Sequence, residues 1–138
     1  TPAAPLQGVP CLNDGVAQDV SGHRVPAQQD LSYNIAITKT FLTGSGSVDI
    51  RLSRKYRGES YADIWNNDRA EIPESHNGDL LVSYRPNDGD WYVNGFVKNL
   101  DDSRDLIYLR AGSNFQGGNL YGSITEPRTF GLMFGTKF

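Results

Sequence analysis

The sequence has a single cysteine, no long apolar run and no excess of positive charge. Because Cys11 stands alone, no disulfide closes within the chain, and its thiol is either free or paired outside this sequence. No segment approaches the roughly 18 apolar residues of a transmembrane helix, so a membrane location would require strands. The net charge of −3 provides no basic patch for phosphates, which argues against a nucleic-acid partner.

Motifs of common enzymes and metal sites are also missing. The chain has no Gly-x-Ser-x-Gly turn and no phosphate-binding loop. His23 and His76 fall in polar, turn-rich stretches without a cysteine or carboxylate at ligand spacing, so we expect both to be solvated loop residues. The sequence therefore predicts no metal site, no cofactor and no catalytic residue, and it favours a protein that is not an enzyme.

The beginning of the chain lacks the features of a secretory signal. Thr1-Pro-Ala-Ala-Pro5 has neither a charged start nor an apolar core, so we expect a mature form or an internal fragment. Residues 1–28 contain four prolines and no lasting period, which predicts an irregular segment.

The sequence does contain strict alternation, most clearly at its end. Phe130, Leu132, Phe134 and Phe138 alternate with small or polar residues. A period of two predicts a β-strand with one apolar face. A bare apolar face favours aggregation in water, whereas lipid is a suitable solvent for it. An ordinary edge strand of a soluble sandwich is the alternative.

The same period appears twice between residues 29 and 56. The apolar positions alternate with polar or charged ones such as Asp49, Arg51 and Lys55. A charged face suits a water-filled lumen better than a packed core. We therefore predict a set of membrane-facing side chains: Leu31, Tyr33, Ile35, Ile37, Val48, Ile50, Leu52, Phe130, Leu132, Phe134 and Phe138.

Six segments have the composition and period of strands, and they cover residues 29–41, 48–56, 79–85, 91–100, 106–111 and 128–138. Glycine-, asparagine- or aspartate-rich turns separate several of them, whereas residues 57–78 and 112–127 predict longer irregular connections. The predicted fold is all-β, an antiparallel meander of about six strands that makes residues 29–138 part of a transmembrane β-barrel. A small closed soluble β-barrel is the alternative.

Aromatic residues gather near the predicted strand ends, as they do in the interfacial rings of membrane barrels. In a soluble sheet the same side chains would form cross-strand packing pairs. Neighbouring charges favour the interfacial rings. The residues concerned are Tyr33, Tyr56, Tyr84, Trp91, Tyr92 and Tyr108.

Four local motifs follow one another along the chain. Gly22-His-Arg-Val-Pro26 precedes a strand, and Tyr56-Arg-Gly-Glu-Ser-Tyr-Ala-Asp63 combines an aromatic strand end with an acidic residue. Val97-Lys-Asn-Leu-Asp101 has the form of a turn between late strands. Glu126-Pro-Arg128 precedes the strand that ends in Phe138. In order and spacing, these motifs resemble the C-terminal part of TonB-dependent outer-membrane receptors.

The resemblance covers roughly residues 20–138 and implies a bacterial outer-membrane receptor that imports a bulky nutrient, such as a metal chelate, with energy supplied through TonB. Such receptors are 22-stranded barrels with a plugged lumen, whereas about six strands are predicted here. The resemblance therefore implies several partners: the remainder of the barrel and its plug, the lipid bilayer, and TonB through the missing part. A disulfide partner of Cys11 upstream of Thr1 would fit this interpretation.

The loop before the last predicted strand mixes glycines with aromatic and amide side chains. The resemblance implies that this loop faces outside, where it would contact an incoming ligand. The predicted ligand-binding residues are Asn114, Phe115, Gln116 and Tyr121, and a plain surface loop is the alternative.

Two other functions fit the pattern. A small soluble β-barrel would bind or act on an apolar small molecule in its cavity. Its inward-facing side chains would be Leu31, Ile35, Ile50, Leu52, Phe130 and Phe134. Alternatively, several copies would complete a larger barrel or sheet, because open strand edges must be paired or covered.

Overall fold

The computed structural model describes residues 19–111 and 119–136. The regular elements in these ranges are β-strands and one short 3₁₀ helix, η1 (Asp68–Ala70). The strands pair in antiparallel fashion, which confirms the prediction of an all-β, antiparallel fold. The described residues include no helix with the length and apolarity needed to cross a membrane.

The chain divides into two compact units, each assembled from separated stretches of sequence. The larger unit takes residues 31–57, 76–104 and 125–138, and the smaller unit takes residues 1–30, 58–75 and 105–124. The division therefore alternates along the chain, whereas the sequence suggested one boundary after residue 28.

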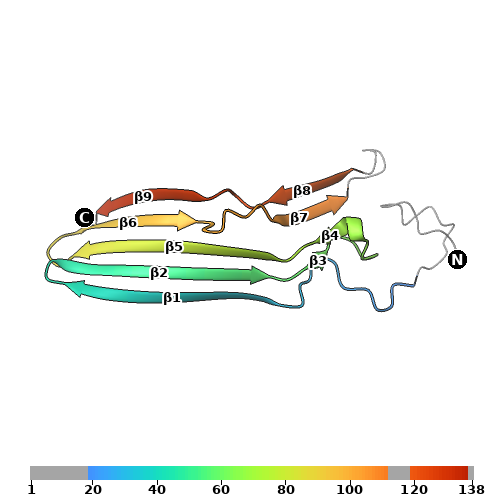
Figure 1. Ribbon diagram of the computed structural model, residues 1–138, viewed down its shortest axis with the longest axis horizontal. Helices are drawn as coiled ribbons and strands as arrows, with labels where there is room; N and C mark the ends of the chain where they lie inside the picture. The colour runs from blue at the N-terminus through green and yellow to red at the C-terminus, as the bar shows by residue number, and fades with distance from the viewer. Residues whose placement is uncertain (1–18, 112–118, 137–138) are drawn as a thin grey trace. The chain divides into compact units, whose positions relative to one another are not determined.

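The larger unit is a five-stranded sheet with the order β1-β2-β5-β6-β9 (Figure 1). Its strands are β1 (Ser32–Thr43), β2 (Gly46–Arg57), β5 (Ser75–Pro86), β6 (Trp91–Lys98) and β9 (Thr129–Thr136). Each strand lies beside the preceding strand of the same sheet, as in a meander. Within the described ranges, β1 and β9 each have one unpaired edge, so the sheet is open.

The two ends of this sheet differ in their connections. At one end, the β1–β2 pairing closes with Thr43 opposite Gly46, and residues 87–90 link β5 to β6. The two turns contact each other, because Asn87 donates its backbone N–H to the Ser45 carbonyl at 3.0 Å. At the opposite end, residues 58–74 and 99–128 form much longer connections.

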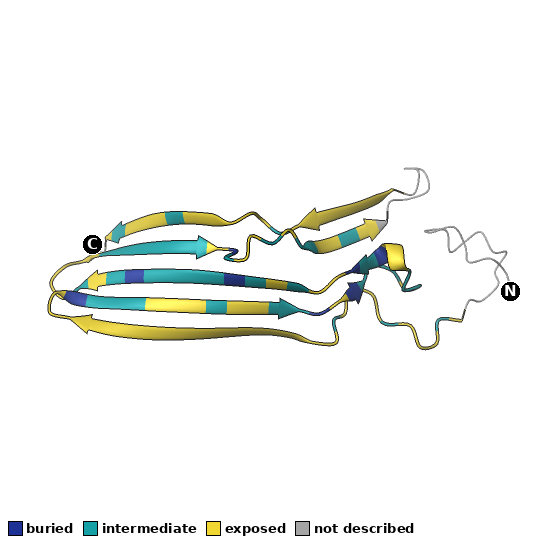
Figure 2. Cartoon of the chain, viewed as in Figure 1, coloured by how far each residue is buried: buried dark blue, intermediate teal, exposed yellow. Residues whose placement is uncertain are grey.

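The smaller unit contains two short hairpins. β3 (Ser60–Tyr61) pairs with β4 (Glu71–Ile72), and β7 (Leu106–Ala111) pairs with β8 (Leu120–Ile124). This unit holds the buried hydrophobic side chains found among the described residues, those of Ala70 and Ile72. Figure 2 shows dark blue in the short strands β3 and β4 and also at single positions of β2 and β5, whereas β1, at one edge of the sheet, is yellow along its length.

The prediction that residues 106–111 belong to the meander was wrong. This segment does form a strand, but residues 120–124, which were predicted as loop, supply its partner. As a result β6 pairs directly with β9, from Trp91 opposite Thr136 to Lys98 opposite Thr129. The composition of a strand reveals its tendency to pair but carries no information about its neighbour.

The prediction of an irregular segment at residues 57–78 was also wrong. It contains β3, η1, β4 and the beginning of β5, which starts at Ser75 instead of residue 79. Two-residue strands are too short to display a period, so alternation could not reveal them.

Candidate functional site

Strand register places the apolar side chains of β1 and β2 on one face of the sheet. Ile37 lies opposite Leu52, and Phe41 lies opposite Val48. Because successive residues of a strand point to opposite faces, the polar pair Thr40 and Asp49 occupies the other side. The Thr40 hydroxyl donates to the Asp49 carboxylate at 2.6 Å there. The alternation seen in the sequence therefore corresponds to two chemically different faces.

The other three strands continue both faces. Val82 of β5 lies opposite Gly95 of β6, and Gly95 lies opposite Leu132 of β9. Two ion pairs between β2 and β5 show which residues of the two strands lie on the polar side. Lys55 Nζ lies 3.8 Å from Asp79 Oδ2, and Arg85 Nη1 lies 3.2 Å from Asp49 Oδ2. These four residues share one side, and most of the large apolar residues of the five strands lie on the other side. Leu42, Leu81, Phe96 and Met133 are exceptions that lie on the polar side.

We call this second side the apolar face. Its most exposed members are Leu132 at 83%, Phe130 at 79% and Ile37 at 69% relative accessibility. Soluble monomers rarely leave such a contiguous apolar surface uncovered. Its apolar residues are Tyr33, Ile35, Ile37, Phe41, Val48, Ile50, Leu52, Leu80, Val82, Val93, Val97, Phe130, Leu132 and Phe134, and the cationic residues Lys39 and Arg54 lie on the same side.

Nine of the eleven residues predicted to face a membrane lie on the apolar face. Leu31 immediately precedes β1 and is exposed, whereas Phe138 lies outside the described residues. Leu80, Val82, Val93 and Val97 were absent from the predicted set. They follow the same alternation in β5 and β6, so the period of two could have identified them.

Aromatic side chains mark one end of the apolar face. The rings of Tyr33 and Tyr56 stack with centroids 5.1 Å apart, and Tyr56 lies 5.1 Å from the ring of His76. His76 was predicted to be a loop residue, which was wrong because β5 begins at Ser75. The residues just before the predicted strand are polar, so their sequence does not reveal that the strand begins at Ser75.

A second aromatic cluster marks the opposite end. The Trp91 ring lies 5.6 Å from that of Tyr84 and 6.0 Å from that of Phe134. Tyr92 and Tyr108 were also predicted to lie in the interfacial belts, but they belong to neither aromatic cluster. Tyr92 lies on the polar side, and Tyr108 belongs to β7 in the smaller unit.

The polar side has an aromatic feature of its own between β6 and β9. A Cβ added at Gly131 would lie only 2.7 Å from Cζ of Phe96, and one at Gly135 would overlap the Tyr92 ring. The two rings therefore lie directly over the two glycines of the neighbouring strand. Glycine is required at these positions by close approach of a side chain.

A hydrogen-bonded turn holds three strands together at the end with long connections. Asn99, which is 3% exposed and has a φ of 53°, donates from Nδ2 to the carbonyls of Ser103 at 2.9 Å and Glu126 at 2.8 Å. Its backbone N–H donates to Asp79 Oδ1 at 3.1 Å. The structure thereby brings together the motifs at residues 97–101 and 126–128.

The same turn carries charged contacts. Arg128 donates its backbone N–H to Asp102 Oδ1 at 2.9 Å and its Nη2 group to the Leu100 carbonyl at 2.8 Å. Arg54 of β2 pairs with Asp101. The hydrogen bond from the Arg54 guanidinium is the main reason that the pKa of Asp101 lies below its ordinary value.

The remaining two motifs meet in the smaller unit. The backbone N–H of Arg24 donates to Asn66 Oδ1, and the Arg24 guanidinium contacts Glu59 at 2.6 Å and Asp30 at 3.0 Å. The hydrogen bond to Glu59 chiefly raises the pKa of Arg24. His23 Nδ1 lies 2.9 Å from the Ile64 carbonyl. These contacts are structural, because each tethers the segment before β1 to the β3–β4 region.

Of the predicted ligand-binding residues, only Tyr121 falls in the described ranges. It lies in β8 opposite Arg110 and is 52% exposed. Asn114, Phe115 and Gln116 lie outside the described residues, as does Cys11. Within the described ranges, no three histidine, cysteine or acidic side chains gather as metal ligands would. The clearest candidate for a functional surface is therefore the apolar face.

The chain was compared with known protein families, curated proteins and solved structures. No family model, no curated protein and no solved structure matches the chain.

Proposed function

We propose that the five-stranded sheet is a wall segment of a bacterial outer-membrane β-barrel, of the kind found in TonB-dependent receptors, and serves the import of a bulky nutrient such as a metal chelate. The observation that carries this proposal is the pairing of an exposed apolar face with an ion-paired polar face on one sheet. The wall of such a barrel presents its apolar side to lipid and its polar side to the lumen.

The dimensions of the sheet support the proposal. β1, β2 and β5 each contain 12 residues, and a membrane-spanning strand needs about 9–11. The aromatic residues Tyr33 and Phe41 are separated by about 27 Å along β1 at roughly 3.4 Å per residue. A strand tilt of about 40° reduces this to about 20 Å across the membrane, close to the ~25 Å apolar band of outer-membrane barrels.

The connections of the sheet support an orientation. Outer-membrane barrels have short turns on the periplasmic side and long loops on the outer side. By this criterion, residues 44–45 and 87–90 belong on the periplasmic side. Residues 58–74 and 99–128 then leave the sheet on the outer side.

The open edges of the sheet support a requirement for partner strands. The outer edges of β1 and β9 present unpaired backbone groups within the described residues. Hydrocarbon leaves such groups without hydrogen bonds, so a wall segment in lipid must be continued on both sides. The proposed partners are the remaining strands of the receptor barrel. The plug and TonB rest on the sequence resemblance alone.

Site-directed spin labelling tests the proposal at neighbouring positions. In a Cys11→Ser background, Ile37→Cys and Leu132→Cys would carry nitroxides on the apolar face, and Thr38→Cys and Met133→Cys would carry them on the polar face. In the full chain reconstituted with lipid, we expect the first pair to be quenched by oxygen and the second pair by a water-soluble nickel chelate. The proposal fails if all four labels respond equally to the nickel chelate.

A small closed soluble barrel has less support. Its proposed inward-facing residues include Leu31, Ile35 and Phe130, and all three are exposed, while the sheet that carries Ile35 and Phe130 is open within the described residues. The native mass of the particle, extracted with and without detergent, distinguishes the possibilities. A soluble particle near 15.2 kDa would favour a small barrel, a multiple of that mass would favour an assembly of copies, and a larger detergent-requiring particle with a second polypeptide would favour the receptor segment.

A further inference from the structure

Charged side chains make the polar side of the five-stranded sheet strongly positive. Alternate residues of a strand share a side, so the register assigns each charged residue to one side. Within the described strands of the sheet, the cations of the polar side are Arg51, Lys55, Arg57, Arg85 and Lys98, and its acids are Asp49 and Asp79. This side therefore has an excess of three positive charges, whereas the whole chain has a net charge of −3.

Three of these cations, Arg51, Lys55 and Arg57, follow one another along β2, and we call them the cationic row. The β1 residues opposite them are short and uncharged: Thr38, Asn34 and Ser32. Strand β1 therefore supplies no carboxylate to the row, and both Arg51 and Lys55 are exposed. The row begins at the end of the sheet with the long connections and reaches the middle of β2.

The two acids of the polar side do not neutralise the cationic row. Asp79 lies 3.8 Å from Lys55, and Asp49 lies 3.2 Å from Arg85, so both carboxylates are already paired. In the part of the chain that the structure describes, no carboxylate lies within ion-pair distance of Arg51. A guanidinium presents paired N–H donors that match the oxygens of an anion.

A further cation lies on the polar side of β6. Lys98 is the last residue of β6, next to the long connection, and its Nζ lies 5.8 Å from the centroid of the Phe96 ring. Among the described residues, no carboxylate lies within ion-pair distance of Lys98. Positive charge on this side is therefore not confined to β2.

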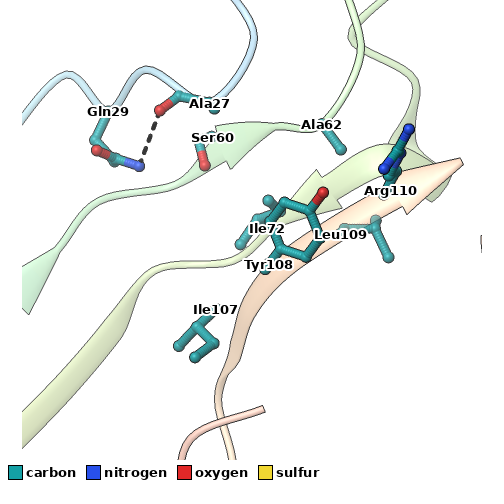
Figure 3. A pocket seen from close by; sticks show the side chains of 9 residues that line it. All are labelled: Ala27, Gln29, Ser60, Ala62, Ile72, Ile107, Tyr108, Leu109 and Arg110. Atoms are coloured by element: carbon teal, nitrogen blue, oxygen red, sulfur yellow. Dashed lines mark hydrogen bonds between the residues drawn. The ribbon is translucent and has the colours of Figure 1, made fainter. Parts of the chain in front are cut away.

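The smaller unit has no comparable arrangement around its cavity. This cavity has a volume of about 350 Å³, and its lining includes Ser60 of β3 and Ile72 of β4 (Figure 3). Arg110 is the charged residue of the lining. It follows Leu109 directly in β7, so the two side chains lie on opposite faces of that strand. The cavity thus has one cation, whereas β2 presents three on one side.

We propose that the solute carried along the polar side is an anion, a metal chelate of net negative charge, and that Arg51 and Lys55 are successive contacts for it. This inference rests on the proposed barrel wall, because the polar side lines a lumen only there. A surface with an excess of one charge raises the local concentration of oppositely charged solutes. Arg51, which has no carboxylate partner, extends this attraction from the outer end to the middle of the sheet.

A nitroxide at Ala36→Cys tests the charge of this surface. Ala36 is exposed and lies opposite Ser53, which separates Arg51 from Lys55 along β2. In the full chain with Cys11→Ser, reconstituted with lipid, collision rates are measured with chromium(III) trisoxalate, a negative metal chelate, and with a neutral nickel chelate. We expect the ratio of the two rates to be about threefold higher than for a free nitroxide in water. In about 1 M salt, where the Debye length is about 3 Å, the ratio should fall towards that of the free nitroxide.

Matched variants assign the effect to the cationic row. We expect Arg51→Gln to remove about half of the excess in the ratio, because it deletes the cation that no carboxylate neutralises. Lys39→Gln deletes the same charge from the apolar face and should leave the ratio unchanged. The proposal is overturned if the label at Ala36→Cys shows no preference for the negative chelate, or if the two variants reduce that preference equally.

The label at Ile37→Cys separates this inference from the proposed wall. If that label is in lipid and the label at Ala36→Cys shows no preference for the negative chelate, the wall is retained and the anionic solute is overturned. If the label at Ile37→Cys is in water, the wall is overturned and the carried anion with it.

Discussion

The five-stranded sheet and the smaller unit differ in whether they bury hydrophobic side chains. In the sheet, large apolar side chains such as Leu132 and Phe130 are exposed, whereas the polar residues Ser83 and Asn99 are buried. In the smaller unit, Ala70 and Ile72 are the buried hydrophobic residues. The smaller unit thus has a small buried apolar core, although Val25 and Ile124 are exposed, whereas the described strands of the sheet bury no hydrophobic side chain.

This difference has consequences for stability. Burial of apolar surface is the main favourable contribution to folding, and it must exceed the conformational entropy of the chain. The sheet has no described hydrophobic core to provide that contribution. Its strands are instead joined by backbone hydrogen bonds, ion pairs and the turn around Asn99. An external apolar phase would supply the missing burial.

Charge placed on the apolar face should produce the largest effect. In lipid vesicles, we expect Leu132→Arg to destabilise the sheet by about 2–4 kcal/mol, because it brings a cation into the hydrocarbon. The adjacent Met133→Arg lies on the polar side and should cost about 1 kcal/mol or less. Urea titration of the reconstituted protein measures both. Equal effects of the two substitutions would remove the distinction between the faces.

The turn around Asn99 should produce the next largest effect. We expect Asn99→Ala to cost about 2–3 kcal/mol, because it removes the donors to Ser103 and Glu126 and leaves alanine at a positive φ. Asn99→Gly removes the same donors but tolerates the backbone, so it should recover about 1 kcal/mol. The unfolding free energies of the two variants separate these contributions. Stability equal to that of the parent in both would show that the sheet does not depend on this turn.

Substitution of the glycines under the aromatic rings should have a smaller effect on stability, and this effect should depend on the ring above. We expect Gly131→Ala to cost about 1–2 kcal/mol, because its Cβ would press on the Phe96 ring. In a Phe96→Ala background the cost should fall to a few tenths of a kcal/mol. Gly44→Ala is the control, because no atom lies within 4 Å of a Cβ at that position. Absence of coupling between residues 96 and 131 in a double-mutant cycle would contradict this packing.

The ion pair between Arg54 and Asp101 should produce the smallest effect, as a pH dependence. The pKa of Asp101 is lowered in the folded state, so the carboxylate stabilises the fold above its unfolded pKa of about 3.9. That contribution is lost as the pH falls through the lowered, folded pKa. Asp101→Asn should therefore flatten the stability profile below about pH 4 and leave its shape unchanged near neutrality. An unchanged acid limb in the variant would contradict the assignment.

The sequence allowed much of the sheet to be predicted. Alternation correctly identified the strands of the sheet and the shared face of Ile37, Leu52 and Phe134, because the period of two follows from the backbone itself. It failed for β3 and β4, which are too short to show a period. It also could not indicate that Ser60 lines a cavity, because an isolated serine has no distinguishing pattern.

By itself, the sequence determined the all-β class, the alternation of apolar and polar side chains, and the tight turns between neighbouring strands. These properties depend on neighbouring residues along one strand. Only the tertiary structure decided that β9 pairs with β6, that residues 106–111 join the smaller unit, and that Asn99 links Ser103 to Glu126. The reason is physical: pairing and burial depend on residues far apart in the chain, and competition among possible partners is resolved only in three dimensions.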